Sequence, residues 1–153
     1  MPQKRLAITL LPALLCAGLA APSLASDDSL QDAIDYRSGV MNVFSWNLGP
    51  MGAMLKDKIP YAQAAFARHA SDLASAAALD VLSGFPDDSV SEDSAAMSEI
   101  WLDWDDFAAK YDDLKQESAK LAEAAAGGDK AAIAAQFDAT RKTCKACHKQ
   151  YKE

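Results

Sequence analysis

Residues that interrupt helices are scarce in this chain. Its 153 residues include seven glycines and six prolines. These two residue types have the lowest helix propensity, so their scarcity, together with abundant alanine, favours helix over strand. Half of the chain is hydrophobic and 24% is charged, which is ordinary for a globular protein. The length is sufficient for one domain with a hydrophobic core.

Basic residues are in the minority. The chain has 15 Lys and Arg against 22 Asp and Glu, a formal net charge of −7. An acidic protein repels the phosphates of nucleic acids, so we expect no nucleic-acid partner. A solvated acidic surface is the simplest interpretation of this charge, and a basic redox partner is a second one.

Long hydrophobic runs are also missing, except at the N-terminus. Lys4 and Arg5 precede an almost uninterrupted apolar run over residues 6–21, and small residues lead up to Ala25. This pattern predicts a secretory signal peptide over residues 1–25, cleaved after Ala25. The apolar run is too short for a membrane-spanning helix.

Cleavage would leave a mature domain of residues 26–153 in the periplasm. The signal peptide contains two of the basic residues, so 13 would remain against 22 acids, a net charge of −9. Cys16 would be lost too. It follows Leu15, where a lipoprotein signal needs a small residue, so we expect no membrane anchor. The mature chain would keep Cys144 and Cys147.

Four segments with helical periodicity follow. The first has apolar residues at alternating spacings of three and four, interrupted by one charge: Leu30, Ile34, Arg37, Met41, Phe44, Leu48, Met51 and Leu55. Such alternation is typical of the seam of a helix bundle. We predict an all-α fold, an antiparallel up-down-up-down four-helix bundle. Its helices are expected over residues 29–58, 61–82, 95–126 and 129–151, with a loop over 83–94.

The last predicted helix carries the sequence Cys144-Lys145-Ala146-Cys147-His148. Cys-x-x-Cys-His is the pattern of covalent haem attachment. Two thiols three residues apart on a helix lie on one face, where each can bond one vinyl group of the same porphyrin. The adjacent imidazole can ligate the iron. Because Cys144 and Cys147 fall on the apolar stripe of this helix, we expect the haem in the core of the bundle.

Three other interpretations of the two cysteines are weaker. A Cys-x-x-Cys redox centre normally opens a helix after a strand, and no strand is predicted here. A zinc site needs a fourth ligand, and His69 is the one other histidine. In the third interpretation, the cysteines form a structural disulfide in a bundle that serves as an interaction module.

Together these features resemble the cytochrome c′ family over essentially the whole mature chain. The segments that carry the likeness are Tyr36-Arg37-Ser38-Gly39-Val40-Met41, Leu48-Gly49-Pro50-Met51, Ile59-Pro60-Tyr61, Glu99-Ile100-Trp101 with Trp104 and Phe107, and Cys144 to Tyr151. The resemblance implies haem c, one per chain and covalently bound. It also implies that Arg37 reaches the haem propionates, and that Met41 covers the side of the haem opposite His148. Lys152 stands where family members often carry Arg.

The role of Met41 separates two functions. In high-spin members of the family, this place holds a side chain that does not ligate, and the five-coordinate iron binds small gases, chiefly NO and CO. In low-spin relatives, a Met here ligates the iron and the protein carries electrons. The resemblance favours the first function, with single-electron transfer to redox partner proteins, and leaves His148/Met41 ligation as the alternative. No acid–base or nucleophile constellation is present, so we do not expect an enzyme.

The resemblance also implies a homodimer, because relatives commonly dimerise through their first two helices. Val43 and Trp46 lie off the apolar stripe of the first helix and are available for such a contact. The same side chains would alternatively pack against a neighbouring helix within the bundle.

Overall fold

The computed structural model describes residues 27–87, 89–91 and 94–153, and it is helical apart from one isolated β-bridge. The signal peptide predicted over residues 1–25, with Cys16, lies outside the described residues. The four long helices are α1 (Asp27–Leu55), α2 (Gln63–Ala77), α4 (Trp104–Gly127) and α5 (Lys130–Tyr151). Two short elements separate α2 from α4: the 3₁₀ helix η1 (Val81–Gly84) and α3 (Glu99–Leu102).

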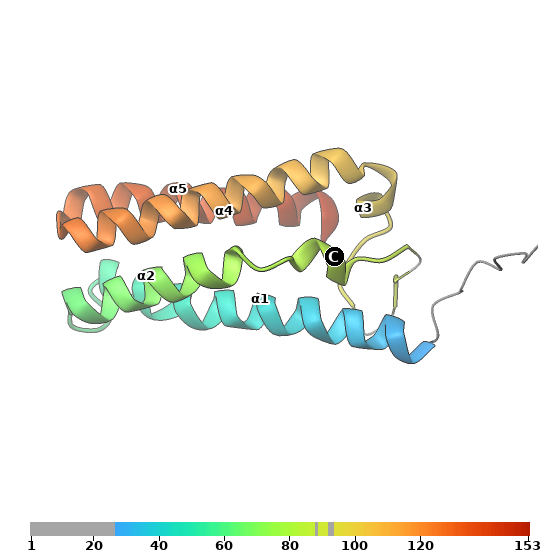
Figure 1. Ribbon diagram of the computed structural model, residues 1–153. Helices are drawn as coiled ribbons and strands as arrows, with labels where there is room; N and C mark the ends of the chain where they lie inside the picture. Colours follow the sequence, from blue (N-terminus) through green and yellow to red (C-terminus); the bar gives the residue numbers. More distant parts are fainter. Residues whose placement is uncertain (1–26, 88, 92–93) are drawn as a thin grey trace, which may run out of the picture.

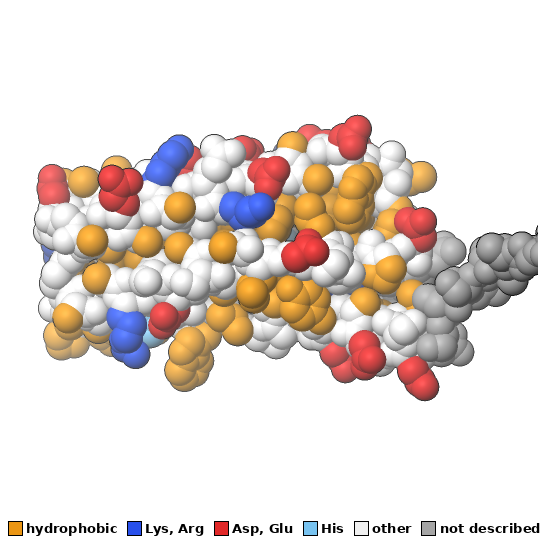
Figure 2. All heavy atoms as spheres, viewed as in Figure 1, with side chains coloured by type: hydrophobic (Ala, Val, Ile, Leu, Met, Phe, Trp, Pro, Cys, Tyr) orange, Lys and Arg blue, Asp and Glu red, His pale blue; other side chains and the backbone are white. Residues whose placement is uncertain are grey.

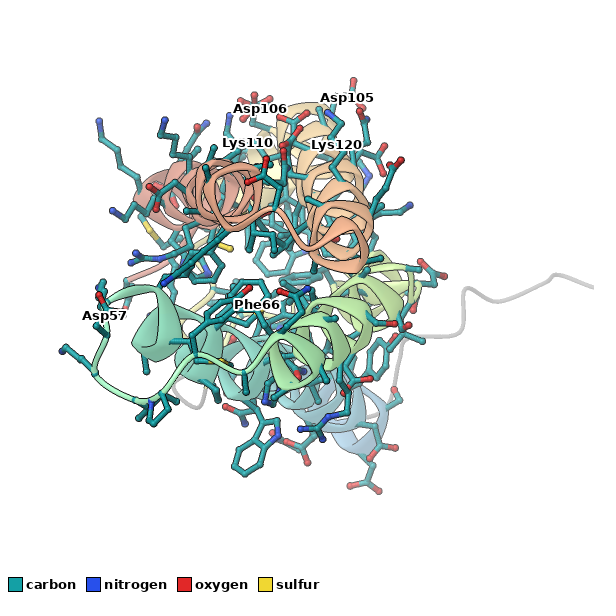
Figure 3. All side chains as sticks on the ribbon, turned by 90° about the vertical axis from the view of Figure 1, so that its left-hand side faces the viewer. Asp57, Phe66, Asp105, Asp106, Lys110 and Lys120 are labelled. Atoms are coloured by element: carbon teal, nitrogen blue, oxygen red, sulfur yellow. The ribbon has the colours of Figure 1, made fainter. Side chains whose placement is uncertain are left out.

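The long helices form an antiparallel bundle (Figure 1). α1 and α2 lie side by side with opposite directions, and α4 and α5 form the second such pair. α4 packs against both α5 and α2. Seen along the bundle, Phe66 points into the centre, whereas Asp105, Lys110 and Lys120 point outward from α4 (Figure 3). The predicted up-down-up-down four-helix bundle is therefore confirmed.

The turn between α4 and α5 follows the expected chemistry of helix ends. Gly128 ends α4 in the left-handed conformation, with φ of 78°, which glycine adopts without a steric penalty. The side chain of Asp129 then accepts hydrogen bonds from the backbone N–H groups of Ala131 and Ala132, at 2.9 and 3.5 Å. This N-cap satisfies two donors of the first turn of α5.

The predicted third helix over residues 95–126 is wrong at its start. Segment 95–97 is extended and pairs with the end of α5: Met97 N–H donates to the Tyr151 carbonyl at 3.0 Å, and Glu153 N–H to the Ala95 carbonyl at 3.1 Å. Asp103, with φ of −134° and ψ of 54°, then separates α3 from α4. The second helix also ends earlier than predicted, at Ala77, and the chain continues into η1.

The buried face of α1 is rotated relative to the predicted stripe. Ile34, Arg37, Phe44 and Met51 are buried as expected, but Val40, Asn47 and Met54 are buried as well. Met41, Leu48 and Leu55 are only partly buried. The bundle therefore leaves one flank of α1 incompletely covered, on the side that carries Met41.

Hydrophobic side chains also reach the surface over the end of the bundle where α3 lies and α4 begins (Figure 2). Leu102 is the most exposed large hydrophobic residue there, at 83%. Within residues 27–87, 89–91 and 94–153, we find no helix that combines the length and apolarity needed to span a membrane.

Candidate functional site

Three cavities follow one another where α1 faces α5, and each is lined by residues of both helices. We call this side of the bundle the α1–α5 seam. The first two cavities share four lining residues: Met41, Phe107, Cys147 and His148. They hold about 510 and 590 Å³ of space, open solvent at their mouths included. Because the two cavities share these residues, they form one continuous hollow along the seam.

Cys144 and Cys147 lie one turn apart on α5, and both line the second cavity. Both are free thiols. Burial raises the pKa of the Cys144 thiol, and it raises the pKa of Cys147 to about 11. The two sulfur atoms are therefore protonated at neutral pH and sit in apolar surroundings on one side of the helix. That arrangement suits two covalent bonds to a single planar group.

His148 follows Cys147 directly and lines both cavities. Partial burial lowers the pKa of its imidazole, and the positive charge of Lys152 lowers it further. The imidazole is therefore neutral at pH 7, which is the form that ligates a metal ion.

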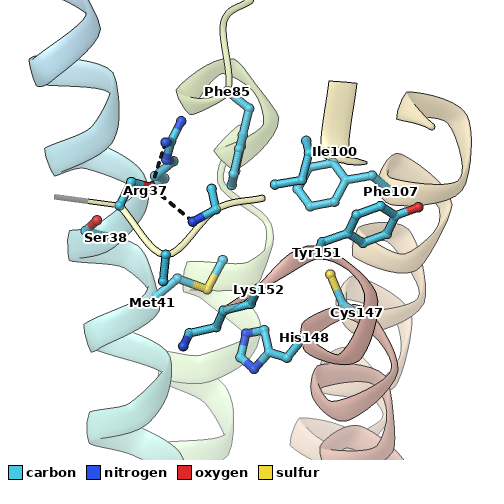
Figure 4. A pocket seen from close by; sticks show the side chains of 13 residues that line it. Arg37, Ser38, Met41, Phe85, Ile100, Phe107, Cys147, His148, Tyr151 and Lys152 are labelled. Carbon is cyan, nitrogen blue, oxygen red and sulfur yellow. Dashed lines mark hydrogen bonds between the residues drawn. The ribbon is translucent and has the colours of Figure 1, made fainter. Parts of the chain in front are cut away.

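Met41 lies on the opposite wall. Its side chain extends from α1 into the cavity, toward the end of α5 that carries His148 (Figure 4). This explains its partial exposure: Met41 packs against the edge of the hydrophobic core, and its thioether reaches into the cavity of the seam. The structure thus brings together Met41 and His148, which are far apart in sequence.

Arg37 is buried, with 3% of its surface exposed, and it also lines the first cavity. Its Nη1 donates to the Gly84 carbonyl at 2.9 Å and to Ser89 Oγ at 2.6 Å. Its Nη2 donates to the Ser89 carbonyl at 2.6 Å and to Ser94 Oγ at 2.8 Å. The guanidinium also lies over the Phe85 ring, 4.7 Å from its centroid. These contacts satisfy the buried charge within the described residues.

Sequence reasoning missed the partners of Arg37, because it assigned residues 83–94 to a loop and predicted no contact between this loop and Arg37. Trp101 is a second residue that holds this segment, since its Nε1 donates to the Phe85 and Pro86 carbonyls at 3.2 and 3.0 Å. The Arg in an apolar stripe was a signal that polar partners had to exist. Nothing in the spacing showed that a serine-containing loop would supply them.

The residues of the first two cavities fit a haem. The wall is largely apolar, two free thiols lie on one face of α5, and a neutral imidazole stands beside them. The zinc interpretation finds no support. His69 Nδ1 lies 2.9 Å from Asn47 Oδ1, in a contact between α2 and α1, and His69 lines none of the three cavities. Across the described part of the chain, no group of three or more His, Cys, Asp or Glu residues could hold a metal ion.

Comparison with known proteins gives the family. A family model described as Cytochrome C′ matches residues 32–152. The chain is 35% identical over 128 residues to cytochrome c′ of Halomonas halodenitrificans, covering 80% of this chain and 96% of that protein.

Solved structures agree. Cytochrome c prime from Shewanella frigidimarina has 36% identity and a TM-score of 0.79, over 84% of this chain and 99% of that one. A nitric oxide complex of a cytochrome c prime variant from Alcaligenes xylosoxidans has 28% identity and a TM-score of 0.74, over 81% and 95% of the two chains. The chain therefore belongs to the cytochrome c′ family of c-type cytochromes, which carry covalently bound haem c.

Proposed function

We propose that Cys144 and Cys147 hold one haem c through thioether bonds and that His148 is its axial ligand. The proposal is supported by the position of these three residues on one wall of the α1–α5 seam, beside two largely apolar cavities. The two covalent bonds would keep the haem in place permanently. His148 would therefore need only to direct its neutral imidazole ring toward the iron.

The proposal assigns Arg37 to the haem propionates. Arg37 lines the same cavity as Met41 and His148. All four of its hydrogen bonds in the described residues come from Nη1 and Nη2. Propionate binding therefore requires Nε, or the exchange of one loop contact for a carboxylate oxygen. A charge-assisted bond to a carboxylate is stronger than a bond to a neutral oxygen, which favours such an exchange.

The function that we propose is reversible binding of small gases, NO and CO, together with single-electron transfer in the periplasm. Haem iron would supply an open coordination position and a one-electron redox change. The single observation that carries this function is the apolar cavity between Met41 and His148, lined also by Phe107. Apolar walls would exclude charged ligands and admit diatomic molecules. The proposal assigns the residues of this cavity to holding and covering the haem, so the proposed function is not enzymatic.

Low-spin electron transfer with His148 and Met41 as axial ligands is the second candidate. The position of Met41 across the cavity from the end of α5 favours it (Figure 4). Thioether sulfur is a common axial ligand of haem iron in electron carriers.

Absorption spectra of the purified protein test both candidates. The proposed function predicts broad high-spin bands in the ferric and ferrous forms, and a ferrous spectrum that shifts with CO. Sharp low-spin bands that do not respond to CO would select the second candidate. A colourless protein would refute both.

The variant Met41→Ala adds a second readout. A five-coordinate protein should stay high-spin and should bind CO faster, because a side chain that covers the cavity has been shortened. A Met41-ligated protein should change from low-spin to high-spin. Met97→Ala is the matched control, since Met97 lines none of the three cavities; it should leave the spectrum unchanged.

We also propose that two copies of the chain associate through α1 and α2. Val43 is 43% exposed and Trp46 is 76% exposed. These side chains therefore do not pack within the bundle, which was the other possibility for them. A tryptophan with most of its ring in water is a strong contributor when a partner covers it.

A further inference from the structure

The basic residues are unevenly distributed along the chain. Residues 141–152 contain five of the 15 Lys and Arg and no Asp or Glu. This stretch is the end of α5, the same segment that holds Cys144, Cys147 and His148. An acidic protein thus has its densest positive charge at the predicted haem attachment site.

Three of these cations line up along the α1–α5 seam. Arg141, Lys145 and Lys152 share one stripe of α5 with the neutral His148, because the four residues are spaced by four, three and four positions. Arg141 lines the third cavity and Lys152 lines the first. The stripe therefore follows the seam past all three cavities.

Along most of the seam, α1 supplies no opposing charge, because its residues 38–55 contain no Asp or Glu. The aspartates of α1 all lie in its first nine residues, 27–35. Beyond its last turn, Lys56 and Lys58 line the third cavity together with Arg141. We call Lys56, Lys58, Arg141, Lys145 and Lys152 the basic rim.

The basic rim is not neutralised by ion pairs within the described residues. The ion pairs found there use four other lysines: Lys110, Lys115, Lys120 and Lys130. Lys152 Nζ donates to the backbone carbonyl of Glu153 at 3.0 Å, which leaves its charge in place.

Acidic side chains near the basic rim reduce its charge without cancelling it. Asp57 is engaged by Lys130, with 3.9 Å between Nζ and Oδ1. Asp138 and Glu153 are exposed near the two ends of the stripe. The five cations of the basic rim outnumber these two carboxylates.

We infer that the basic rim is the docking surface for an acidic redox partner protein, through which electrons enter and leave the haem. This inference rests on the proposed haem site, and it differs from the second interpretation of the net charge, a basic redox partner. Surface charges separated by more than about 8–10 Å are largely screened at physiological salt, so a partner responds to the local surface. Complementary charge at the contact raises the association rate and orients the partner.

The test measures one-electron oxidation of the ferrous holoprotein by two small complexes of opposite charge. Ferricyanide, an anion, takes one electron from the ferrous iron and becomes ferrocyanide. Tris(phenanthroline)cobalt(III), a cation, is reduced to its cobalt(II) form in the same way. Stopped-flow rate constants are recorded from about 10 to 300 mM ionic strength, a range over which the Debye length falls from about 30 Å to below 8 Å.

For the wild type, we expect the ferricyanide rate to fall by roughly tenfold as salt increases, and the cobalt rate to rise or stay constant. Poly-L-glutamate, a model for an acidic protein face, should slow the ferricyanide reaction at low salt. Inorganic phosphate is added as a comparison, at the same total concentration of negative charge. If phosphate slows the ferricyanide reaction and poly-L-glutamate does not, the surface is a small-anion site and the docking inference is overturned.

The variant Lys145→Glu should lose most of the salt dependence and the inhibition by poly-L-glutamate. Lys115→Glu is the matched control, because it makes the same charge change on α4, outside the three cavities; it should behave as the wild type. A ferricyanide rate that rises with salt, or equal responses of the two variants, overturns the inference. A protein without haem is colourless and gives no signal in this experiment. Failure of the proposed function is therefore seen in the absorption spectrum, before any rate constant is measured.

Discussion

At the scale of single residues, the contact between Arg37 and Gly84 connects α1 to the segment after α2. The Gly84 carbonyl accepts a hydrogen bond from Arg37. A Cβ atom at Gly84 would lie 2.9 Å from Tyr36 Cδ1, 3.2 Å from Arg37 Cβ and 3.3 Å from the Ala33 carbonyl oxygen. The two backbones approach each other so closely that only glycine fits here without displacement.

We therefore predict that Gly84→Ala destabilises the fold. Overpacking at a close contact costs about 1–3 kcal/mol, and the displaced segment would also weaken the hydrogen bonds of Arg37. Urea denaturation of the holoprotein measures the change in the free energy of unfolding.

Gly39→Ala is the matched control on α1, because its Cβ would meet nothing within 4 Å. Alanine is a better helix former than glycine by about 1 kcal/mol, so this variant should be as stable as the wild type or more stable. If both variants change the free energy of unfolding equally, close approach at Gly84 is not the cause.

At the scale of elements, polar side chains join α4 to α5. The Tyr151 hydroxyl donates to Asp106 Oδ2 at 2.6 Å. Farther along, Gln136 Nε2 donates to Glu117 Oε2 at 2.6 Å, and Thr140 Oγ1 to the Glu117 carbonyl at 3.1 Å. These contacts hold the helix that carries the cysteines in a defined register on its neighbour.

The contact between Asp106 and Tyr151 makes stability depend on pH. The hydroxyl of Tyr151, and then Lys110, lower the pKa of the Asp106 carboxyl. Because the folded-state pKa is the lower one, the stabilisation is present above the unfolded-state pKa of about 4 and is lost as the pH falls through the folded-state value. As the pH falls below about 4, urea midpoints should therefore decrease more steeply for the wild type than for Asp106→Asn.

Asp105→Asn controls for the loss of one negative charge, because Asp105 is the neighbouring carboxylate and points outward from α4 (Figure 3). It should keep the wild-type dependence of the urea midpoint on pH. Identical profiles for the wild type and Asp106→Asn would contradict the role of the Tyr151 contact.

The split between α3 and α4 shows where periodicity failed as a predictor of elements. Met97, Ile100 and Trp104 continue the helical spacing, so the sequence predicted one helix. The segment before Ile100 instead bonds to the end of α5, through Met97 and Glu153. This pairing joins residues about fifty positions apart, and local patterns contain no information on such contacts.

At the scale of the whole molecule, the exposed face of α1 determines the association that we propose. Trp46→Ala should weaken the dimer by about 2 kcal/mol, roughly thirtyfold in the dissociation constant, because an exposed tryptophan at an interface centre contributes most of its apolar surface. Sedimentation equilibrium of the holoprotein measures this constant.

Leu102→Ala serves as the control, since Leu102 is an exposed hydrophobic residue of α3 and lies outside the proposed interface. Its dimer constant should equal that of the wild type. A monomeric wild type, or equal effects of both substitutions, would rule out α1 as the interface.

The sequence alone determined the helical fold, the four-helix architecture and the attachment motif. These properties depend on local quantities: helix propensity, the spacing of apolar residues, and the position of Cys144, Cys147 and His148 within one stretch of chain. Even Arg37 and Met41 were predicted as neighbours of the haem, though by family resemblance and not by spacing.

Only the tertiary structure decided which flank of each helix remains uncovered. Met41 and Leu48 had the spacing of core residues, yet they line cavities of the α1–α5 seam, because the remaining contacts of the bundle already bury the adjacent face of α1. The partners of Arg37 and the basic rim also depend on this packing. A residue's spacing along one helix gives its direction from the axis, but what lies in that direction is set by the other helices.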